Sequence, residues 1–348
     1  MTMIEELVAK ARADGASDIH LIAGLPPKYR LSGDVVNMSE TPLTAEDCFA
    51  VARYLCGVDF DNFDRIGEFD GADTFAGNRC RIHLFKQQGV PSLALRLLRE
   101  EIPQLETLSL PPAVAPLVEL HKGIVLVTGE TGSGKSTTLA ALIDSINHKY
   151  YRHIVTLEDP VEYVYKPDKC AINQREVGKD TVSFAAGLRA SLREDPNVIL
   201  IGEMRDRETI ETAITAAVTG HLVFGTLHTG SASDAVDRIV QVFPEGAQTQ
   251  IRLQLSMTLQ AVLTQQLVPK KGGGRALAAE FMLVTDAIRN LIRSGNTPQI
   301  ANAVATSAAI GGQTMDQALV KLVRSGQITR DTAMHYAHDA DYVKKNAI

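Results

Sequence analysis

The sequence predicts an α/β protein of two domains, an N-terminal α+β domain and a larger domain with a parallel sheet that ends in helices. Length is the first reason, because 348 residues exceed what one hydrophobic core usually organises. The second is a change near residue 112, from hairpin-forming strands to apolar strands that alternate with helical segments. The third is Gly-x-x-x-x-Gly-Lys-Ser at 129–136, between an apolar strand and a helix.

Residues 1–100 are predicted to form the α+β domain with an antiparallel sheet. Polar and apolar residues alternate through 71–87, which predicts a hairpin. Thr44 is placed to cap a helix over 44–57. Further strands are predicted at 16–24, 26–36 and 91–98.

The second domain is predicted over 113–348, after a polar, proline-bearing linker at 101–112. Apolar strands of about five residues alternate there with helical segments, which is typical of βαβ units and a largely parallel sheet. Those strands read "IVLVT", "HIVTL", "VILIG" and "LVFGT". "KGGGR" at 271–275 is predicted to be a hairpin turn, and the chain from about residue 285 is predicted to be helical.

Composition narrows the class of protein. Apolar residues make up 45% and charged residues 22%, and the net charge of 35 − 41 = −6 disfavours nucleic acid as a partner. None of the four cysteines lies in a Cys-x-x-Cys pair, which argues against a structural zinc site. The N-terminus does not resemble a signal peptide and the apolar runs are strand-length, so we expect a cytoplasmic protein without direct membrane insertion.

The glycine-rich loop predicts a nucleotide site. Its glycines permit backbone angles that curl N–H groups around phosphate oxygens, and the helix N-terminus adds its positive end. Lys135 is expected to reach the β- and γ-phosphates of ATP, and Ser136 to hold Mg²⁺. The predicted binding residues are Gly129, Glu130, Thr131, Gly132, Ser133, Gly134, Lys135, Ser136 and Thr137.

Acidic and histidine side chains follow three other apolar strands. Glu203 comes after "NVILIG", and Glu158, Asp159 and Glu162 end or follow "HIVTL". Acids beside a phosphate loop would repel ATP unless a cation intervened, which favours a role at Mg²⁺ or its waters over ordinary surface acids. His228 lies in a Gly- and Thr-rich turn after "LVFGT", a position suited to sensing a γ-phosphate.

Four ordered segments together resemble the secretion ATPase superfamily, the hexameric motors of type II secretion and type IV pili. "GETGSGKSTT" resembles its Walker A, "TLEDPVEY" its Asp box, "ILIGEMRD" its Walker B and "TGHLVFGTLHTGSA" its His box. "GASDIHLIAGLPPKYRLSGDV" is similar to the first domain of that family, so the resemblance spans nearly the whole chain. It implies a PAS-like N-terminal domain followed by a RecA-like P-loop ATPase domain.

The resemblance also implies roles for single residues. It makes Glu203 the catalytic glutamate, Glu158 an acid that positions Mg²⁺ or water, and His228 a phosphate sensor. Arginines complete the site in this family, and the matching positions are Arg81, Arg189 and Arg193. Guanidinium groups can neutralise charge on the transferring phosphoryl group, although ordinary surface ion pairs are the alternative for each.

"AIRNLIRSG" at 287–295 and "GGQTMDQALVKLV" are similar to the retraction ATPases of the PilT family. Assembly ATPases of the superfamily commonly carry a longer N-terminal extension and a four-cysteine module, and this sequence shows neither. Ser294 stands where the PilT family commonly has Glu. The first segment predicts a helix capped by Thr285 and ended by Gly295. Its apolar face is expected to comprise Val284, Ala287, Ile288, Leu291 and Ile292, and Arg289, Asn290 and Arg293 are expected to point outward, toward a partner or a neighbouring subunit. Its predicted retraction motif comprises Ala287, Ile288, Arg289, Asn290, Leu291, Ile292 and Arg293.

The sequence thus predicts a Mg²⁺-dependent ATPase, a homohexameric motor that powers pilus retraction at the cytoplasmic face of the inner membrane. Its expected partner is the pilus platform protein of that membrane, and a paralogous retraction ATPase stays open as another. An assembly or type II secretion motor is the nearest alternative. A low-turnover regulatory module and a nucleic-acid translocase are alternatives from other classes.

Overall fold

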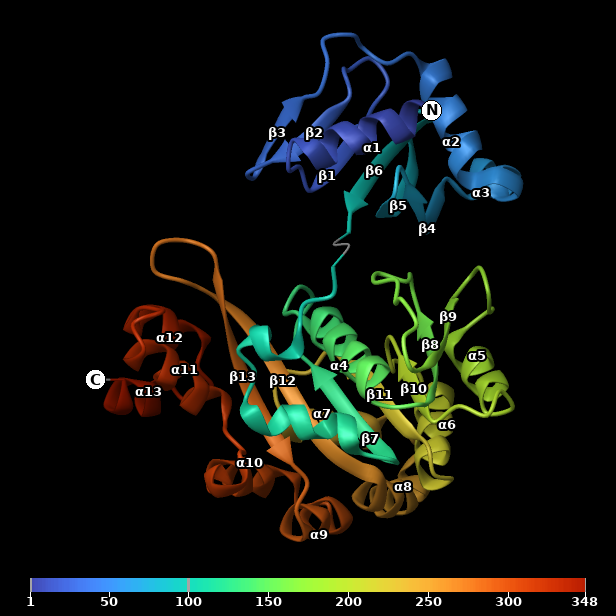
Figure 1. Ribbon diagram of the computed structural model, residues 1–348. Coiled ribbons are helices and arrows are strands. Elements are labelled where there is room, and N and C mark those ends of the chain that lie inside the picture. The colour runs from blue at the N-terminus through green and yellow to red at the C-terminus, as the bar shows by residue number, and fades with distance from the viewer. Residues whose placement is uncertain (1, 99–100, 348) are drawn as a thin grey trace. The chain divides into compact units, whose positions relative to one another are not determined.

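The computed structural model of the chain describes residues 2–98 and 101–347 and divides into two compact units (Figure 1). Unit 1 comprises Met1–Glu101 with Pro160–Val164, and unit 2 comprises Ile102–Asp159 with Tyr165–Ile348. The short second segment of unit 1 is held by Arg79, whose Nε donates to the Val161 carbonyl at 3.1 Å. Residues 99 and 100, where the sequence analysis ends the first domain, lie outside the described residues.

Unit 1 contains a six-stranded sheet in the order β3-β2-β1-β6-β5-β4, and all its neighbouring strands are antiparallel, as predicted. Strands β4 and β5 form a hairpin, and burial alternates along β5, as expected for a sheet with one packed face. The strands are β1 (Asp18–Leu21), β2 (Lys28–Leu31), β3 (Asp34–Asn37), β4 (Glu68–Phe75), β5 (Asn78–Gln87) and β6 (Val90–Leu97).

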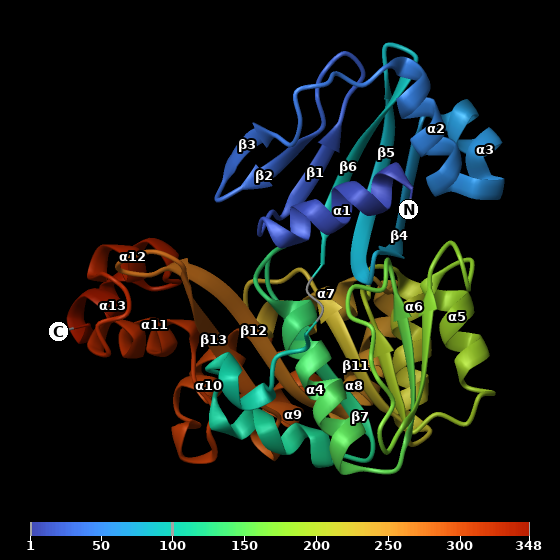
Figure 2. The same cartoon turned by 45° about the horizontal axis from the view of Figure 1, so that its top comes forward.

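Three α-helices pack on this sheet: α1 (Met3–Ala13), α2 (Ala45–Cys56) and α3 (Phe60–Ile66), with a 3₁₀ turn η1 (Gly57–Asp59) before α3. Figure 2 shows α1 lying across the strands. Thr44 caps α2 as predicted, because its Oγ1 accepts from Asp47 N at 3.1 Å while Asp47 Oδ2 accepts from Thr44 N at 2.8 Å. The sequence-based prediction did not include α1.

Unit 2 is built on a seven-stranded sheet in the order β13-β12-β7-β11-β10-β8-β9. All its neighbouring pairs are parallel except β12 with β13, which form the hairpin predicted at 271–275. Strand β9 was not predicted, because it is a polar edge strand without an apolar run. The strands are β7 (Gly123–Thr128), β8 (His153–Glu158), β9 (Ala171–Glu176), β10 (Val198–Ile201), β11 (Leu222–Leu227), β12 (Leu259–Pro269) and β13 (Arg275–Leu283).

Helices surround this sheet and continue to the end of unit 2, which confirms the predicted helical region after β13. They are α4 (Lys135–Lys149), α5 (Phe184–Ser191), α6 (Arg207–Val218), α7 (Ala232–Gln241), α8 (Glu245–Thr258), α9 (Asp286–Ser294), α10 (Ile300–Ala305), α11 (Met315–Arg324), α12 (Arg330–Tyr336) and α13 (Ala340–Asn346). Short 3₁₀ turns are η2 (Leu105–Leu108), η3 (Pro112–Glu119), η4 (Thr297–Gln299) and η5 (Ala308–Ile310).

Two buried apolar clusters include most helices of unit 2. Helices α5 to α10 share one cluster with the parallel strands. Helices α11 to α13 form a smaller cluster with the β12–β13 hairpin, beside which they gather in Figures 1 and 2. Within 2–98 and 101–347, no helix is both long and apolar enough to cross a membrane.

Candidate functional site at the carboxyl ends of the parallel strands

The loop after β7 has a backbone that only glycine adopts without strain. Gly129, Gly132 and Gly134 have φ values of +136°, +79° and +96°, in the region that disfavours side chains. Gly134 directly precedes α4, so the loop ends at the N-terminus of a 15-residue helix. Phosphate groups fit such a site, because free N–H groups and the positive end of the helix dipole converge there.

Lys135 supplies the positive charge of this loop. Its side chain is largely buried, and its Nζ donates to the carbonyl oxygens of Gly129 and Glu130 at 2.7 and 2.9 Å. The ammonium group is therefore folded back over the loop, where it can bind phosphate oxygens. Ser136 is exposed in the first turn of α4, and the Ser133 hydroxyl is buried without a hydrogen-bond partner within the described residues.

Neighbouring strands bring the predicted site residues of unit 2 together. Strands β7, β11, β10 and β8 lie side by side and run parallel, so their carboxyl ends meet at one edge of the sheet. The phosphate loop follows β7, and His228 directly follows β11. Glu203 follows β10 after one intervening residue, and Glu158 ends β8. Each of these four segments therefore contributes to one site.

Glu203 is the centre of the polar contacts at this edge. Its Oε1 pairs with the guanidinium of Arg205 and lies 3.3 Å from Nε2 of His228. The Glu203 side chain is 20% exposed, whereas that of Arg205 is 76% exposed. Such a carboxylate can accept a proton or orient a water molecule while staying accessible to solvent. Arg205 was missed from the sequence, although it lies only two residues after the predicted glutamate.

His228 lies between the acid and the phosphate loop. Burial and the positive charge of Lys135 lower the pKa of its imidazole, although Glu203 acts in the opposite direction. A neutral imidazole can donate one hydrogen bond to a phosphate oxygen and accept another from a neighbour. His221, at the start of β11, instead bonds to the Ala216 carbonyl at 2.9 Å at the end of α6.

Glu158 is held at the end of β8 by two polar neighbours. Its Oε1 accepts from Thr156 Oγ1 at 2.7 Å and from Gln174 Nε2 at 3.3 Å. A carboxylate and the Ser136 hydroxyl are hard oxygen donors of the kind that Mg²⁺ prefers, and Mg²⁺ usually takes few protein ligands beside water and phosphate. The donor set at this edge therefore fits Mg²⁺.

None of the three predicted arginines belongs to the segments that end or follow these strands. Arg81 is exposed on β5 of unit 1, opposite Ala72 and Arg96 in the neighbouring strands. On unit 2, Arg189 in α5 pairs with Glu208. Arg193 donates to the carbonyl of Arg189 at 3.3 Å, and both side chains are exposed. Their place in a reacting site stays a prediction.

Helix α9 has the predicted caps but a different polar face. Thr285 caps its start, Gly295 ends it with φ +72°, and Ile288 and Ile292 are buried in the core shared with α8. Ala287, predicted to lie on the apolar face, is exposed. Leu291 is half-buried and packs against the same core, so the apolar face rests mainly on the core that surrounds the parallel strands of unit 2.

The prediction that Arg289 points outward is wrong. Its Nη1 donates to the carbonyls of Ser256 and Leu259 at 2.7 and 3.2 Å, and its Nη2 donates to Gln260 Oε1 at 3.3 Å. A cation at the C-terminal end of α8 satisfies carbonyls that the helix leaves free and complements its dipole. Asn290 and Arg293 are exposed as predicted and bond to each other at 3.4 Å.

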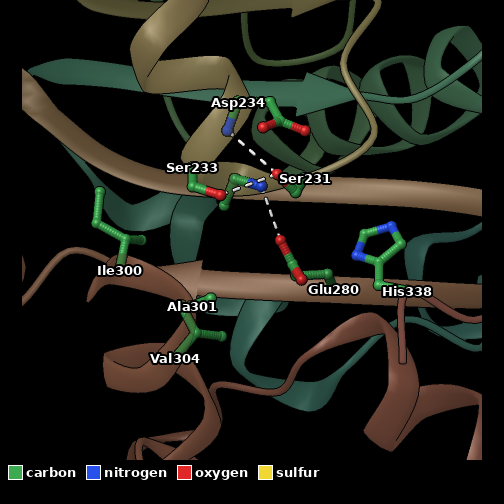
Figure 3. Close-up of a pocket in the computed structure, with 9 residues that line it drawn as sticks. Ser231, Ser233, Asp234, Glu280, Ile300, Ala301, Val304 and His338 are labelled. Carbon is green, nitrogen blue, oxygen red and sulfur yellow. Dashed lines mark hydrogen bonds between the residues drawn. The ribbon is translucent and has the colours of Figure 1, made fainter. Parts of the chain in front are cut away.

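Glu280 is a second polar feature that the sequence analysis missed. Its carboxylate, on β13, accepts from Ala232 N at 2.7 Å and from Met315 N at 3.3 Å, the first residues of α7 and α11. Figure 3 shows it directed at α7 beside a cavity of about 310 Å³, which His338 also lines. Burial raises the pKa of this carboxyl group. An acid inside the apolar strand "RALAAEFML" was the available sequence signal.

A glycine-rich phosphate loop, an acid and a histidine meet at the ends of parallel strands. This arrangement is that of a P-loop nucleotide-binding protein. Residues 83–273 match the family described as type II/IV secretion system protein. The chain is 45% identical to the type IV pilus retractation ATPase PilT of Pseudomonas aeruginosa over 336 residues, covering 96% of this chain and 98% of that protein. It is 43% identical to the twitching motility protein of Neisseria gonorrhoeae over 326 residues, covering 92% and 86%.

A solved structure agrees with these relatives. The crystal structure of the pilus retraction motor PilT with bound ADP superposes with a TM-score of 0.93 at 46% identity, covering 99% of this chain and all of that one. The Legionella pneumophila ATPase DotB gives a TM-score of 0.85 at 27% identity, covering 95% of this chain and 93% of DotB. The chain belongs to the type II/IV secretion system protein family and, within it, to the PilT retraction ATPases.

We expect the imidazole of His228 to titrate below its ordinary pKa of 6.5 in the nucleotide-free protein, and an NMR titration would test this. The unfolded chain then binds this proton more readily than the folded chain, so the stability that His228 contributes is present above pH 6.5 and is lost on acidification. The variant His228→Gln should lose that part of the pH dependence of unfolding. A titration midpoint above 6.5 would show that Glu203 outweighs burial and Lys135.

Proposed function

We propose that this chain hydrolyses ATP to power the retraction of type IV pili. The observation that carries the proposal is the meeting of Lys135, Glu203 and His228 at adjacent strand ends. Relatives named for pilus retraction and twitching motility span nearly the whole chain, which supports retraction over assembly or secretion. An accessible carboxylate beside the phosphate loop likewise supports turnover over a low-turnover regulatory module.

ATP is bound by the residues of the phosphate loop. Backbone N–H groups of the loop surround the phosphates, and Lys135 turns its ammonium from the loop carbonyls toward the β- and γ-phosphate oxygens. Ser136 and Glu158 hold Mg²⁺, directly or through water. When bound, Mg²⁺ neutralises part of the charge on the phosphates.

Glu203 orients the attacking water and accepts its proton, and His228 contacts the γ-phosphate. His228 also lies beside Oε1 of Glu203. Loss of the γ-phosphate therefore changes the partner of His228, and with it the position of the loop before α7. Arg81, Arg189 and Arg193 add positive charge to the site when the domains close.

The working assembly is a homohexamer of two-domain subunits, with a PAS-like N-terminal domain and a RecA-like ATPase domain. The domains extend over 1–100 and 113–348 and are joined by a linker at 101–112. Its partner is the pilus platform protein at the cytoplasmic face of the inner membrane, and a paralogous retraction ATPase is a further one. Neither nucleic acid nor direct membrane insertion has a part in this function.

Replacing Glu203 by Gln should lower kcat for ATP by about 10²-fold or more, because the amide cannot accept the proton of the attacking water. Binding of ATP should be retained, since the phosphate loop is unchanged. Phosphate release by the purified protein and titration with a fluorescent ATP analogue measure the two quantities. The control is Glu211→Gln, an exposed acid that pairs with Arg207 on α6. Turnover that survives in Glu203→Gln would contradict the assignment.

The double variant Asn290→Ala with Arg293→Ala should reduce pilus retraction while leaving ATP turnover at the wild-type rate, because both side chains are exposed on α9. The matched variant Arg289→Ala should lower turnover and stability as well, because it frees the buried carbonyls of Ser256 and Leu259. Imaging of labelled pili and phosphate release give the two readouts. If the double variant lost retraction and turnover equally, the polar face of α9 would have a structural role and not a specific role in retraction.

A further inference from the structure

Strand β12 borders β7 on the side opposite β11, away from Glu203 and His228. Its residue Gln265 is buried, with 1% of its surface exposed. A Cβ at Gly129 would lie only 2.3 Å from the Gln265 carbonyl oxygen. The main chain of β12 therefore abuts the first glycine of the phosphate loop.

The side chain of Gln265 reaches the other end of the same loop. Its Nε2 donates to Oγ1 of Thr138 at 2.8 Å, and both groups are buried. Thr138 lies in the first turn of α4, where its N–H donates to the carbonyl of Gly134 at 3.0 Å. One residue of β12 thus contacts the start of the loop through its main chain and the first turn of the helix after the loop through its side chain.

Packing alone does not account for glutamine at this position. The Oε1 atom of Gln265 is buried and has no hydrogen-bond partner within the residues that the structure describes. Burying an amide oxygen without a partner destabilises the folded state, whereas a leucine of similar size would pack there without that cost. The amide group is therefore best explained by its bond to Thr138.

We propose that Gln265 is a positioning residue for ATP hydrolysis, which holds the phosphate loop against β12 and so sets where Lys135 and Ser136 meet the phosphates. It touches no substrate and acts through Gly129 and Thr138. The inference rests on the proposed hydrolysis of ATP at this loop and adds a residue outside the loop, the acids and the histidine.

The variants Gln265→Leu and Thr138→Val remove the same hydrogen bond from its two ends at nearly constant volume. Each should raise KM for ATP about tenfold and change kcat less than about threefold, because a displaced loop weakens phosphate binding before it affects the attacking water. The double variant should also raise KM only about tenfold, since its two changes remove one interaction. Steady-state phosphate release by the full-length protein measures both constants.

Gln266→Leu is the matched control. It makes the same chemical change one residue along β12, on the opposite face of the sheet, where the Gln266 Oε1 is likewise buried without a partner among the described residues. KM should keep its wild-type value in this variant, and thermal unfolding should confirm that all variants fold. If Gln265→Leu fails to fold, Thr138→Val reports the same bond from the loop.

An unchanged KM in Gln265→Leu and Thr138→Val would overturn the proposal, as would additive effects in the double variant or an equal rise in Gln266→Leu. A shift of the unfolding midpoint with wild-type KM and kcat would reduce Gln265 to a structural role. Lack of ATP hydrolysis by the wild-type protein would instead contradict the proposed function, so the two failures are distinguishable.

Discussion

The backbone of Gly129 approaches β12 so closely that no side chain fits between them, and the geometry of the site depends on that approach. A Cβ there would meet the Gln265 carbonyl at 2.3 Å and the Ser133 hydroxyl at 2.7 Å. The loop is consequently held against β12 on one side, while β11, β10 and β8 present histidine and acids on the other. In the proposed mechanism, the loop that binds phosphate is therefore supported from one side of β7, and the groups that activate water come from the other side of the same sheet.

Strand β12 also connects the site to helix α9, which carries the predicted retraction motif. Arg289 of α9 donates to the Leu259 carbonyl and the Gln260 side chain, where β12 begins. Six residues after Leu259, Gln265 donates to Thr138 in the helix that follows the phosphate loop. Strand β12 is paired on both sides, in parallel with β7 and antiparallel with β13, so both contacts belong to one hydrogen-bonded strand inside the sheet. Part of the retraction motif is therefore an internal anchor, and its exposed part is limited to the outer face of α9.

Patterns among neighbouring residues in the sequence predicted much of the fold and of the candidate site. The phosphate loop, its flanking strand and helix, the Thr44 cap and the α9 caps each depend on a few neighbouring residues, and the structure contains all of them. Glu203, His228 and the loop converge because they follow apolar strands that pair in parallel. Arg289 and Glu280 were misjudged or missed because their partners lie in other segments of the chain, which helical periodicity and strand pattern do not reveal. Arg205 was missed although its partner Glu203 is only two residues away, because no motif or periodic pattern marks such a pair in a loop.

The central claim is that ATP hydrolysis at this site withdraws pili rather than extends them. Time-resolved imaging of fluorescently labelled pili, on cells in which the gene for this chain is deleted, tests it most directly. The account predicts that such cells still extend pili and accumulate them unretracted, and that expression of the wild-type chain restores withdrawal. Cells without pili after the deletion would contradict it and make the protein an assembly motor.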